Sequence, residues 1–214
     1  MIKNIIFDLG AVLLNLDISK TEVAFRALLG SRELHTDVTQ KLHLENFFEK
    51  FETNEIEENE FVATLKTQSR HPLSTEQINT AWSSMLLNFP AERIELLKRL
   101  RSKGYRVFLL SNINSIHLRD VYTIIREEHG NIDFDALFEK PYYSHLIGRR
   151  KPNPDTYHFV LEDAGLKAEE TLFIDDNADN IRTAAEIGIN TILHVANSDV
   201  VKVLEDYLGF EQKN

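Results

Sequence analysis

The chain contains no cysteine, which excludes disulfide bonds, zinc–thiolate sites and thiol nucleophiles. It has no apolar run long enough for a membrane-spanning helix, and no internal repeat or low-complexity tract. Basic residues are the minority, with 24 against 34 acidic residues, so the net charge of −10 offers no general attraction for nucleic acid or for an anionic membrane surface. We therefore expect neither as a partner, and an anionic ligand must be met by a local arrangement of charges.

The composition suits a folded chain with a sizeable core. The 214 residues, 43% of them hydrophobic, are enough for one domain or for one domain carrying an insertion. The apolar opening is interrupted by Asp8, has Lys3 as its only basic residue and lacks a small-residue cleavage pattern. We interpret this opening as a buried strand rather than a signal peptide. We expect a cytoplasmic protein, and the sequence does not indicate its oligomeric state.

A repeated pattern indicates the fold class. An amphipathic helix, a glycine and an apolar strand follow one another three times: Ala91–Lys103, Gly104 and Arg106–Leu110; Pro154–Ala164, Gly165 and Thr171–Ile174; and a helix with Ile181 and Ala184, then Gly188 and Thr191–Val195. Glycine just past a helix adopts the left-handed cap conformation without a steric penalty. Together with a first strand near Lys3–Phe7, this alternation predicts an α/β fold with a doubly wound parallel sheet. Ligands of such sheets bind beyond the carboxyl ends of the strands.

Residues 17–88 differ from the rest, because they show helical periodicity and no convincing strand. We predict a helical insertion there, which divides the chain into a core of residues 1–16 and 89–214 and an inserted domain of residues 17–88. Phe47, Phe48 and Phe51 are expected to pack helices together rather than to line a site. The acidic stretch Glu49–Glu60 is expected to be a solvated turn between helices.

Polar residues follow each predicted strand. Asp8 follows the first, Ser111 and Asn112 follow Arg106–Leu110, Asp175 and Asp176 follow Thr171–Ile174, and Lys151 precedes a helix. Three carboxylates at one sheet edge repel one another unless a cation lies among them, and oxygen ligands favour Mg²⁺ or Ca²⁺. A lysine, a hydroxyl and backbone amides would hold a phosphate, and a carboxylate would attack its phosphorus. Taken singly, each of these residues is more often a helix cap or a loop residue.

Four segments in this order resemble the haloacid dehalogenase-like hydrolases, and the resemblance covers nearly the whole chain. They are IIFDLGAVL, FLLSN, GRRKPNPDTY and TLFIDDNADNIRTAAEIGI. The resemblance implies a Rossmann-like core, and it implies that residues 17–88 are an α-helical cap that closes over the site and selects the substrate. Within the family, FDLGAVLLNLD and LSNIN look most like bacterial sugar phosphatases of the α-glucose-1-phosphate phosphatase type.

The resemblance also implies roles for individual residues. Asp8 would be the nucleophile, and Asp8 and Lys151 would be the catalytic residues. Ser111, the amide of Asn112, Lys151 and Leu9 would bind the phosphate of a small phosphorylated metabolite. A Mg²⁺ cofactor would be held by Asp8, the Gly10 carbonyl and Asp176, with Asp175 in support. Asn180 would orient the acidic loop, which carries Asp175 and Asp176.

One position departs from the family pattern. The phosphatases usually carry a second aspartate two residues after the first, as general acid and base, and this chain has Gly10 there. General acid–base catalysis typically raises the reaction rate by about 10²–10⁴-fold. Without it, the enzyme is expected to be slow or to prefer esters with good leaving groups. Asp17 is one candidate replacement, although a residue at a helix start is its better interpretation. The histidines, among them His117, His129, His145 and His158, show no metal-ligand spacing and are expected at the surface or at element edges.

Two other functions stay open from the sequence. Hydrolytic dehalogenases of the same family also lack the second aspartate, but they place an aromatic residue there and need no metal, whereas this chain keeps Asp175 and Asp176. A non-catalytic ligand-binding domain would keep the crevice without the acid. Turnover of an aryl phosphate with and without Mg²⁺ separates the three.

Overall fold

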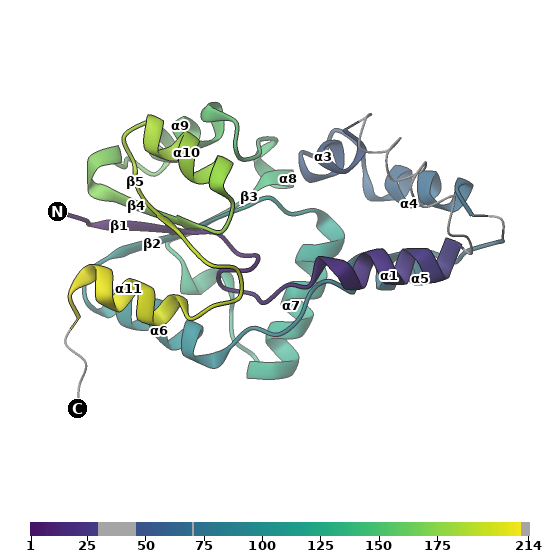
Figure 1. Cartoon of the computed structure of the whole chain (residues 1–214), viewed down its shortest axis with the longest axis horizontal. Coiled ribbons are helices and arrows are strands. Elements are labelled where there is room, and N and C mark those ends of the chain that lie inside the picture. Colours follow the sequence, from purple (N-terminus) through teal and green to yellow (C-terminus); the bar gives the residue numbers. More distant parts are fainter. Residues whose placement is uncertain (30–45, 70, 211–214) are drawn as a thin grey trace.

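The computed structural model describes residues 1–29, 46–69 and 71–210, which form a five-stranded parallel sheet with helices on both faces and a helical segment at one end (Figure 1). The strands are β1 (Asn4–Phe7), β2 (Arg106–Ser111), β3 (Lys140–Tyr143), β4 (Thr171–Asp175) and β5 (Asn190–Leu193). Their order across the sheet is β3-β2-β1-β4-β5. The chain thus winds to one side of β1 and then to the other, which confirms the doubly wound α/β fold.

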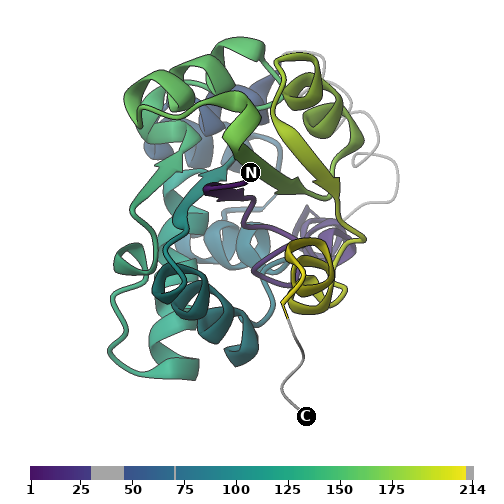
Figure 2. The ribbon, with the colours of Figure 1, turned by 90° about the vertical axis from the view of Figure 1, so that its left-hand side faces the viewer.

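Each central strand is buried on both sides. In β1, Ile5 and Phe7 contribute to the hydrophobic core on one face of the sheet, and Ile6 contributes to the core on the other. The first face is covered by α6 (Ala91–Ser102), α7 (Ser115–His129) and α11 (Val200–Leu208), and the second by α9 (Pro154–Asp163) and α10 (Ala178–Glu186). Figure 2, seen from the side of the N-terminus, shows these two layers above and below the sheet. Burial on both faces explains why these strands appear in the sequence as continuous apolar runs.

The strand register brings the candidate residues to one edge. Phe7, the last residue of β1, pairs with Leu109 of β2 and with Ile174 of β4. The residues that follow these three therefore lie side by side at the carboxyl edge. The returns from helix to strand pass through Gly104, Gly165 and Gly188, all with positive φ, as the sequence pattern predicts.

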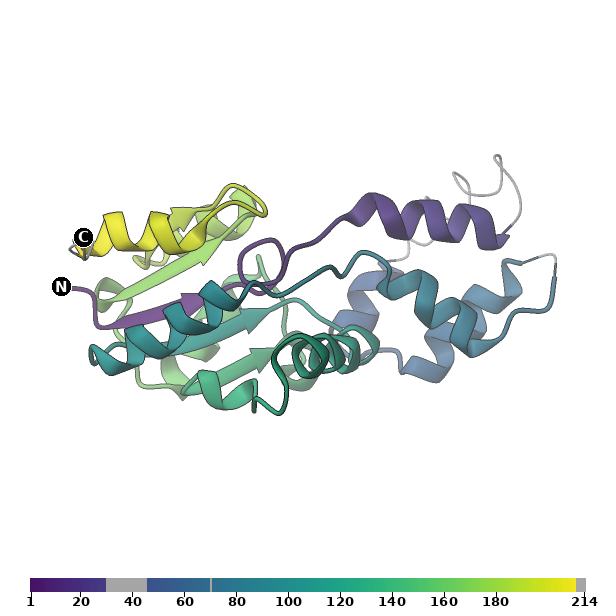
Figure 3. The same ribbon diagram turned by 90° about the horizontal axis from the view of Figure 1, so that it is seen from below.

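Among the described residues between 17 and 88 the named elements are all helices, and we call this stretch the helical segment. It comprises α1 (Ile18–Leu29), α3 (Phe47–Glu52), α4 (Glu58–Thr67) and α5 (Thr75–Ser83), which lie beyond the carboxyl ends of the strands (Figure 3). Phe47 and Phe51 are buried and stack on Phe61 at centroid distances of 5.3 and 4.2 Å. Phe48 stacks on Trp82, so the predicted packing role of these aromatic residues is confirmed. The division into core and cap domains, with its boundaries, stays a prediction.

Some elements differ from those expected. Strand β3 was not predicted, because Lys140 and Pro141 give it a polar, proline-containing sequence that only an edge strand tolerates. Ser111 and Asp175 belong to their strands rather than following them. The short elements are η1 (Asp135–Leu137), α8 (Ser144–Ile147) and η2 (Ala168–Glu170). None of the helices in the described part of the chain is both long and apolar enough to span a membrane.

Candidate active site

Three carboxylates meet at the carboxyl edge of the sheet. Asp8 follows β1 directly, Asp175 ends β4 and Asp176 comes next in the chain. One ligand atom from each lies within 4.8 Å of the other two. Asp8 and Asp175 are buried, and Asp176 is half-buried. The structure thus brings together, from positions 167 residues apart, the acidic residues that the sequence singles out.

Lys151 lies between two of these carboxylates. Its Nζ is 2.7 Å from Asp8 Oδ1 and 2.7 Å from Asp175 Oδ2, and the residue is only 1% exposed. The loop before α9 carries it there, and the Lys151–Pro152 peptide bond in that loop is cis, whereas trans is the commoner form. Lys151 is therefore not an exposed loop lysine, the alternative that its position before a helix left open.

The electrostatics of the cluster show an excess of negative charge. Burial raises the pKa of Asp8 to about 7, and the Asp175 carboxylate adds to this rise while Lys151 opposes it. Burial likewise raises the pKa of Asp176, with Asp175 as a second cause. Burial alone would lower the pKa of Lys151, but the carboxylates of Asp8 and Asp175 outweigh it and hold this pKa above its usual value. All three shifts favour additional positive charge, so the cluster has the electrostatics of a cation site.

Asp175 is occupied by hydrogen bonds. Its Oδ1 accepts from the backbone amide of Asn177 at 2.8 Å, both of its oxygens accept from Asn180 Nδ2 at 3.0 Å, and its Oδ2 also accepts from Lys151. These four bonds use about the number of lone-pair sites that a carboxylate offers. Asp175 is thus placed to hold Lys151 and the acidic loop in position, and Asn180 is placed to orient Asp175.

The remaining oxygens fit a magnesium ion. Among the described residues, no side chain donates a hydrogen bond to the Asp176 carboxylate, and none donates to the Gly10 carbonyl. Both residues line the same pocket as Asp8. An all-oxygen donor set of two carboxylates and one carbonyl matches the preference of Mg²⁺, which keeps water at its other positions. The chemistry of these residues therefore fits the predicted cofactor, and their roles as ligands stay a prediction.

Ser111 and Asn112 serve different purposes. Ser111 ends β2, is 3% exposed and lines the pocket, and its hydroxyl bonds to no described residue. The side chain of Asn112 bonds both backbone groups of Lys151, donating to its carbonyl oxygen at 2.8 Å and accepting from its amide at 2.9 Å. Asn112 therefore connects the end of β2 to the loop before α9 that carries Lys151, which we call the lysine loop. The sequence did not predict this contact. Leu9 is buried, and its backbone amide hydrogen-bonds the Asp8 carboxylate and stabilises its charged form.

Most of the predicted site residues line one pocket of about 530 Å³. It is lined by Asp8, Gly10, Ser111, Asn112, Lys151, Asp176 and Asn180, among others. Asp17 also lines it, directly before α1, where its carboxylate accepts from the backbone amide of Ser19 at 3.1 Å. Hydrogen bonds from Ser19 lower the pKa of Asp17, which makes it a poor proton donor. The helix-start interpretation of Asp17 is confirmed.

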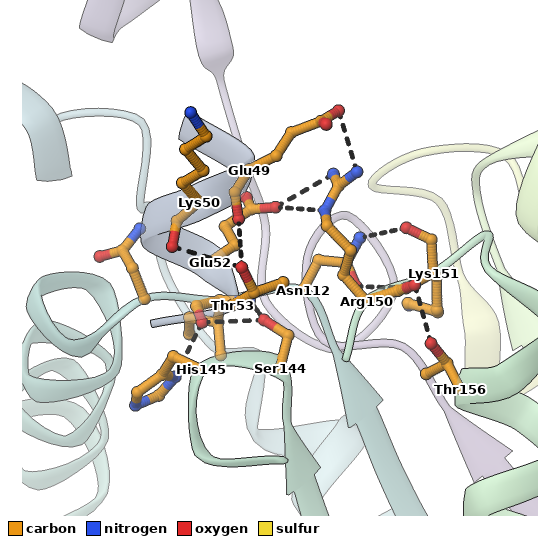
Figure 4. A network of polar contacts seen from close by, with 12 residues as sticks. Glu49, Lys50, Glu52, Thr53, Asn112, Ser144, His145, Arg150, Lys151 and Thr156 are labelled. Carbon is orange, nitrogen blue, oxygen red and sulfur yellow. Dashed lines mark hydrogen bonds and ion pairs between the residues drawn. The ribbon is translucent and has the colours of Figure 1, made fainter. Parts of the chain in front are cut away.

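The acidic stretch of the helical segment is a turn only in its middle part, because residues 53–57 join α3 to α4 whereas its two ends belong to these helices. Glu49 and Glu52 lie in α3 and both pair with Arg150, the residue before Lys151 (Figure 4). Arg150 Nη1 donates to Glu49 Oε1 at 3.0 Å, and Nε donates to Glu52 Oε2 at 3.1 Å. The prediction of a turn between helices is thus confirmed for residues 53–57 and wrong for Glu49 and Glu52, whose partner lies about a hundred residues away along the chain. The result is a direct connection between the helical segment and the lysine loop.

The predicted surface or edge positions of two histidines were also wrong. His117 and His145 are 8% and 9% exposed, and both lie buried against neighbouring elements rather than at the surface. His117 stacks on Trp82 with a centroid distance of 4.9 Å, and its Nε2 is 3.1 Å from the Trp82 carbonyl oxygen. Burial lowers its pKa to about 4, so it is neutral at physiological pH. Both ring nitrogens are engaged, because Nδ1 contacts Asn114 at 3.2 Å.

The comparison with known families decides which protein class carries this geometry. Residues 2–188 match the sequence model described as haloacid dehalogenase-like hydrolase. The chain belongs to the haloacid dehalogenase-like hydrolases. Its fold and the order of its motifs are those of this family, so the resemblance seen in the sequence is confirmed.

Relatives within the haloacid dehalogenase-like hydrolases include phosphatases. The chain is 30% identical to a D-ribitol-5-phosphate phosphatase of Bacteroides thetaiotaomicron over 89% of its own length and 91% of the relative's. It is 29% identical to a sesquiterpene phosphatase of Aspergillus oryzae, over 92% and 91% of the two chains. A family enzyme of Bacteroides thetaiotaomicron, solved in complex with magnesium and inorganic phosphate, superposes with a TM-score of 0.83 at 32% identity, covering 95% of this chain and 99% of that one. These similarities support a hydrolase of the phosphatase type.

Proposed function

We propose that the protein is a Mg²⁺-dependent phosphatase that hydrolyses a small sugar or metabolite phosphate monoester through an aspartyl-phosphate on Asp8. The observation that carries the proposal is the position of Lys151, whose buried Nζ lies 2.7 Å from both Asp8 and Asp175. A cation held there neutralises a nucleophilic carboxylate and the phosphate that approaches it. Relatives of the chain are phosphatases, and the roles of individual residues are our proposal.

In this mechanism each group has a defined task. Asp8 attacks phosphorus, the bond from phosphorus to the ester oxygen breaks and that oxygen takes a proton from solvent water. A second water then cleaves the acyl phosphate to give inorganic phosphate and free Asp8. Lys151 and the Ser111 hydroxyl hold the phosphoryl oxygens, and Asn112 keeps the lysine loop in register with β2. Bound Mg²⁺, held by Asp8, the Gly10 carbonyl and Asp176, would neutralise the charge that develops on the phosphoryl oxygens. The helical segment would act as the cap over this site.

The substrate class follows from the site and the relatives. With Gly10 in place of the acid, esters whose leaving group departs easily are favoured, such as the anomeric phosphate in α-glucose 1-phosphate. The relative that acts on D-ribitol 5-phosphate supports a polyol or sugar phosphate. Hydrolytic dehalogenation is the second candidate, and the carboxylate cluster that includes Asp175 and Asp176 counts against it, because that chemistry needs no metal.

The test is turnover of an aryl phosphate with Mg²⁺ and with chelator, in the wild type and in Asp8→Asn. We expect metal-dependent turnover that Asp8→Asn abolishes without loss of the fold, because an amide cannot form the acyl phosphate. The matched control is Asp179→Asn, which makes the same change at a carboxylate that pairs with Arg182 on the outer face of α10 and should keep wild-type turnover. Metal-free halide release, or near-normal turnover in Asp8→Asn, would contradict the proposal.

A further inference from the structure

A second pocket lies where the helical segment meets the carboxyl edge of the sheet. Its volume is about 270 Å³, and it is lined on the sheet side by Leu9, Ser111 and Asn112 and on the helical side by Glu52, Trp82 and Met85. It shares Gly10, Ser111 and Asn112 with the pocket that holds the carboxylates. A phosphate bound between Asp8 and Ser111 would therefore direct the rest of the ester into this second pocket. We call it the leaving-group pocket.

The charge of the leaving-group pocket comes from one residue. Among the described residues that line it, Glu52 is the only one with a carboxylate, an ammonium or a guanidinium group. His117 also lines it but is neutral, because burial lowers its pKa to about 4. Most of the other walls are apolar. The indole Nε1 of Trp82 is buried and has no hydrogen-bond partner within the described part of the chain.

Glu52 is held in place from the sheet side. Arg150 approaches its Oε2 with both Nε and Nη2 at 3.1 Å, whereas no described residue donates to Oε1 (Figure 4). Burial raises the pKa of Glu52, and the Arg150 guanidinium opposes that rise through a direct contact that favours the carboxylate form. One oxygen is thus fixed by the arginine and the other is left to accept a new hydrogen bond.

We propose that Glu52 selects the leaving group: it accepts hydrogen bonds from the hydroxyls of an uncharged polyol or sugar and excludes leaving groups that carry a second negative charge. This inference rests on the proposed phosphatase function and deepens it. A carboxylate prefers hydroxyl donors, and it repels a carboxylate or second phosphate brought beside it in a partly desolvated pocket. Specificity of this kind comes as much from repelling the wrong ester as from binding the right one.

Two ligands that differ at one carbon test the proposal. Sorbitol 6-phosphate and 6-phosphogluconate share the same acyclic chain, but the first ends in a hydroxymethyl group and the second in a carboxylate. Their dissociation constants would be measured by calorimetry with Mg²⁺ on the Asp8→Asn protein, which cannot turn them over. Their kcat/KM values would be measured on the active enzyme, together with that of an aryl phosphate.

We expect sorbitol 6-phosphate to be favoured at least about tenfold, the size of a modest like-charge penalty. Glu52→Gln should bring the ratio close to one, mainly by improving 6-phosphogluconate. The matched control is Glu49→Gln, which makes the same change at the other partner of Arg150, at a residue outside the leaving-group pocket, and should keep the wild-type ratio.

Several outcomes would overturn the proposal. They are a wild-type ratio near one, binding of neither ligand, and equal shifts in Glu49→Gln and Glu52→Gln, which would mean that Glu52 acts only through Arg150. Failure of the phosphatase function is seen separately, as absent metal-dependent turnover of the aryl phosphate, while the calorimetric ratio still reports on Glu52. Circular dichroism would check that each variant is folded.

Discussion

Gly10 is the residue at which this chain departs from the family pattern. Its surroundings show which residue fills the space of the absent aspartate side chain. Its backbone does not lie in the left-handed region, so a side chain there meets no backbone strain. A Cβ added to Gly10 would lie 2.7 Å from Leu16 Cδ1. The space that an aspartate would need is therefore taken by the end of one flexible, partly buried leucine.

We predict that Gly10→Asp combined with Leu16→Ala raises turnover of alkyl phosphates. The new carboxyl group would donate a proton to the alkoxide that leaves, and trimming Leu16 makes room for it. The gain should reach about 10²-fold at most for alkyl esters and be small for aryl esters, which depart as stabilised phenolates. Steady-state kinetics on one ester of each kind measures it, with Leu16→Ala alone as the control. Equal effects on both ester classes would show that another group already supplies the proton.

At the scale of elements, α5 and α7 meet through a buried histidine. His117 at the start of α7 stacks on Trp82 of α5, with an angle of 13° between the rings. The contact joins the helical segment to a helix that covers the sheet. Its strength depends on pH, because an imidazolium in this position would be buried without a carboxylate in hydrogen-bond contact with it.

The sign of that dependence follows from the pKa of His117, which burial lowers from 6.5 to about 4. The stabilisation is complete above pH 6.5 and is lost as the pH falls toward 4, since the unfolded chain takes up the proton first. We predict that His117→Gln lowers the free energy of unfolding at pH 7.5 but removes a pH-dependent loss of up to about 2 kcal/mol between pH 6.5 and 5. Urea unfolding at several pH values measures both quantities.

The control is His158→Gln, at an exposed position of α9, which should leave the pH dependence of unfolding as in the wild type. Parallel pH profiles for the wild type and His117→Gln would show that His117 does not titrate across the unfolding transition.

At the scale of the whole molecule, a net charge of −10 accompanies a buried cluster in which three carboxylates face one ammonium group. We predict that Mg²⁺ stabilises the folded protein in proportion to the logarithm of its concentration, by about 2.7 kcal/mol at one hundred times its dissociation constant. Thermal unfolding across a Mg²⁺ titration measures this effect. Asp176→Asn should remove most of the shift, because it removes a proposed ligand.

The comparison variant is again Asp179→Asn, three residues further along the same loop and helix, which should respond to Mg²⁺ as the wild type does. The same upward shift in Tm for Asp176→Asn and the wild type would place the ion elsewhere.

The secondary structure was predictable where one local rule governs a segment. Buried strands such as β1 and β4 appear as apolar runs, and glycines end the helices between them, because these signals depend on a few consecutive residues. Strand β3 was missed because an edge strand is stabilised by its neighbour more than by its own sequence. The meeting of Asp8, Asp175 and Asp176 was predictable because strand ends place them at the same edge, whereas Lys151 was singled out by its position before a helix and by the family resemblance.

The sequence by itself determined the fold class, the family and the carboxylates and lysine of the site, since each depends on residue type and order. Tertiary structure alone decided what surrounds them: that Glu52 pairs with Arg150, that His117 is buried on Trp82 and that Leu16 fills the space beside Gly10. The physical reason is that burial and pairing are properties of distance in space. Residues 98 positions apart become neighbours only when the helical segment packs against the edge of the sheet.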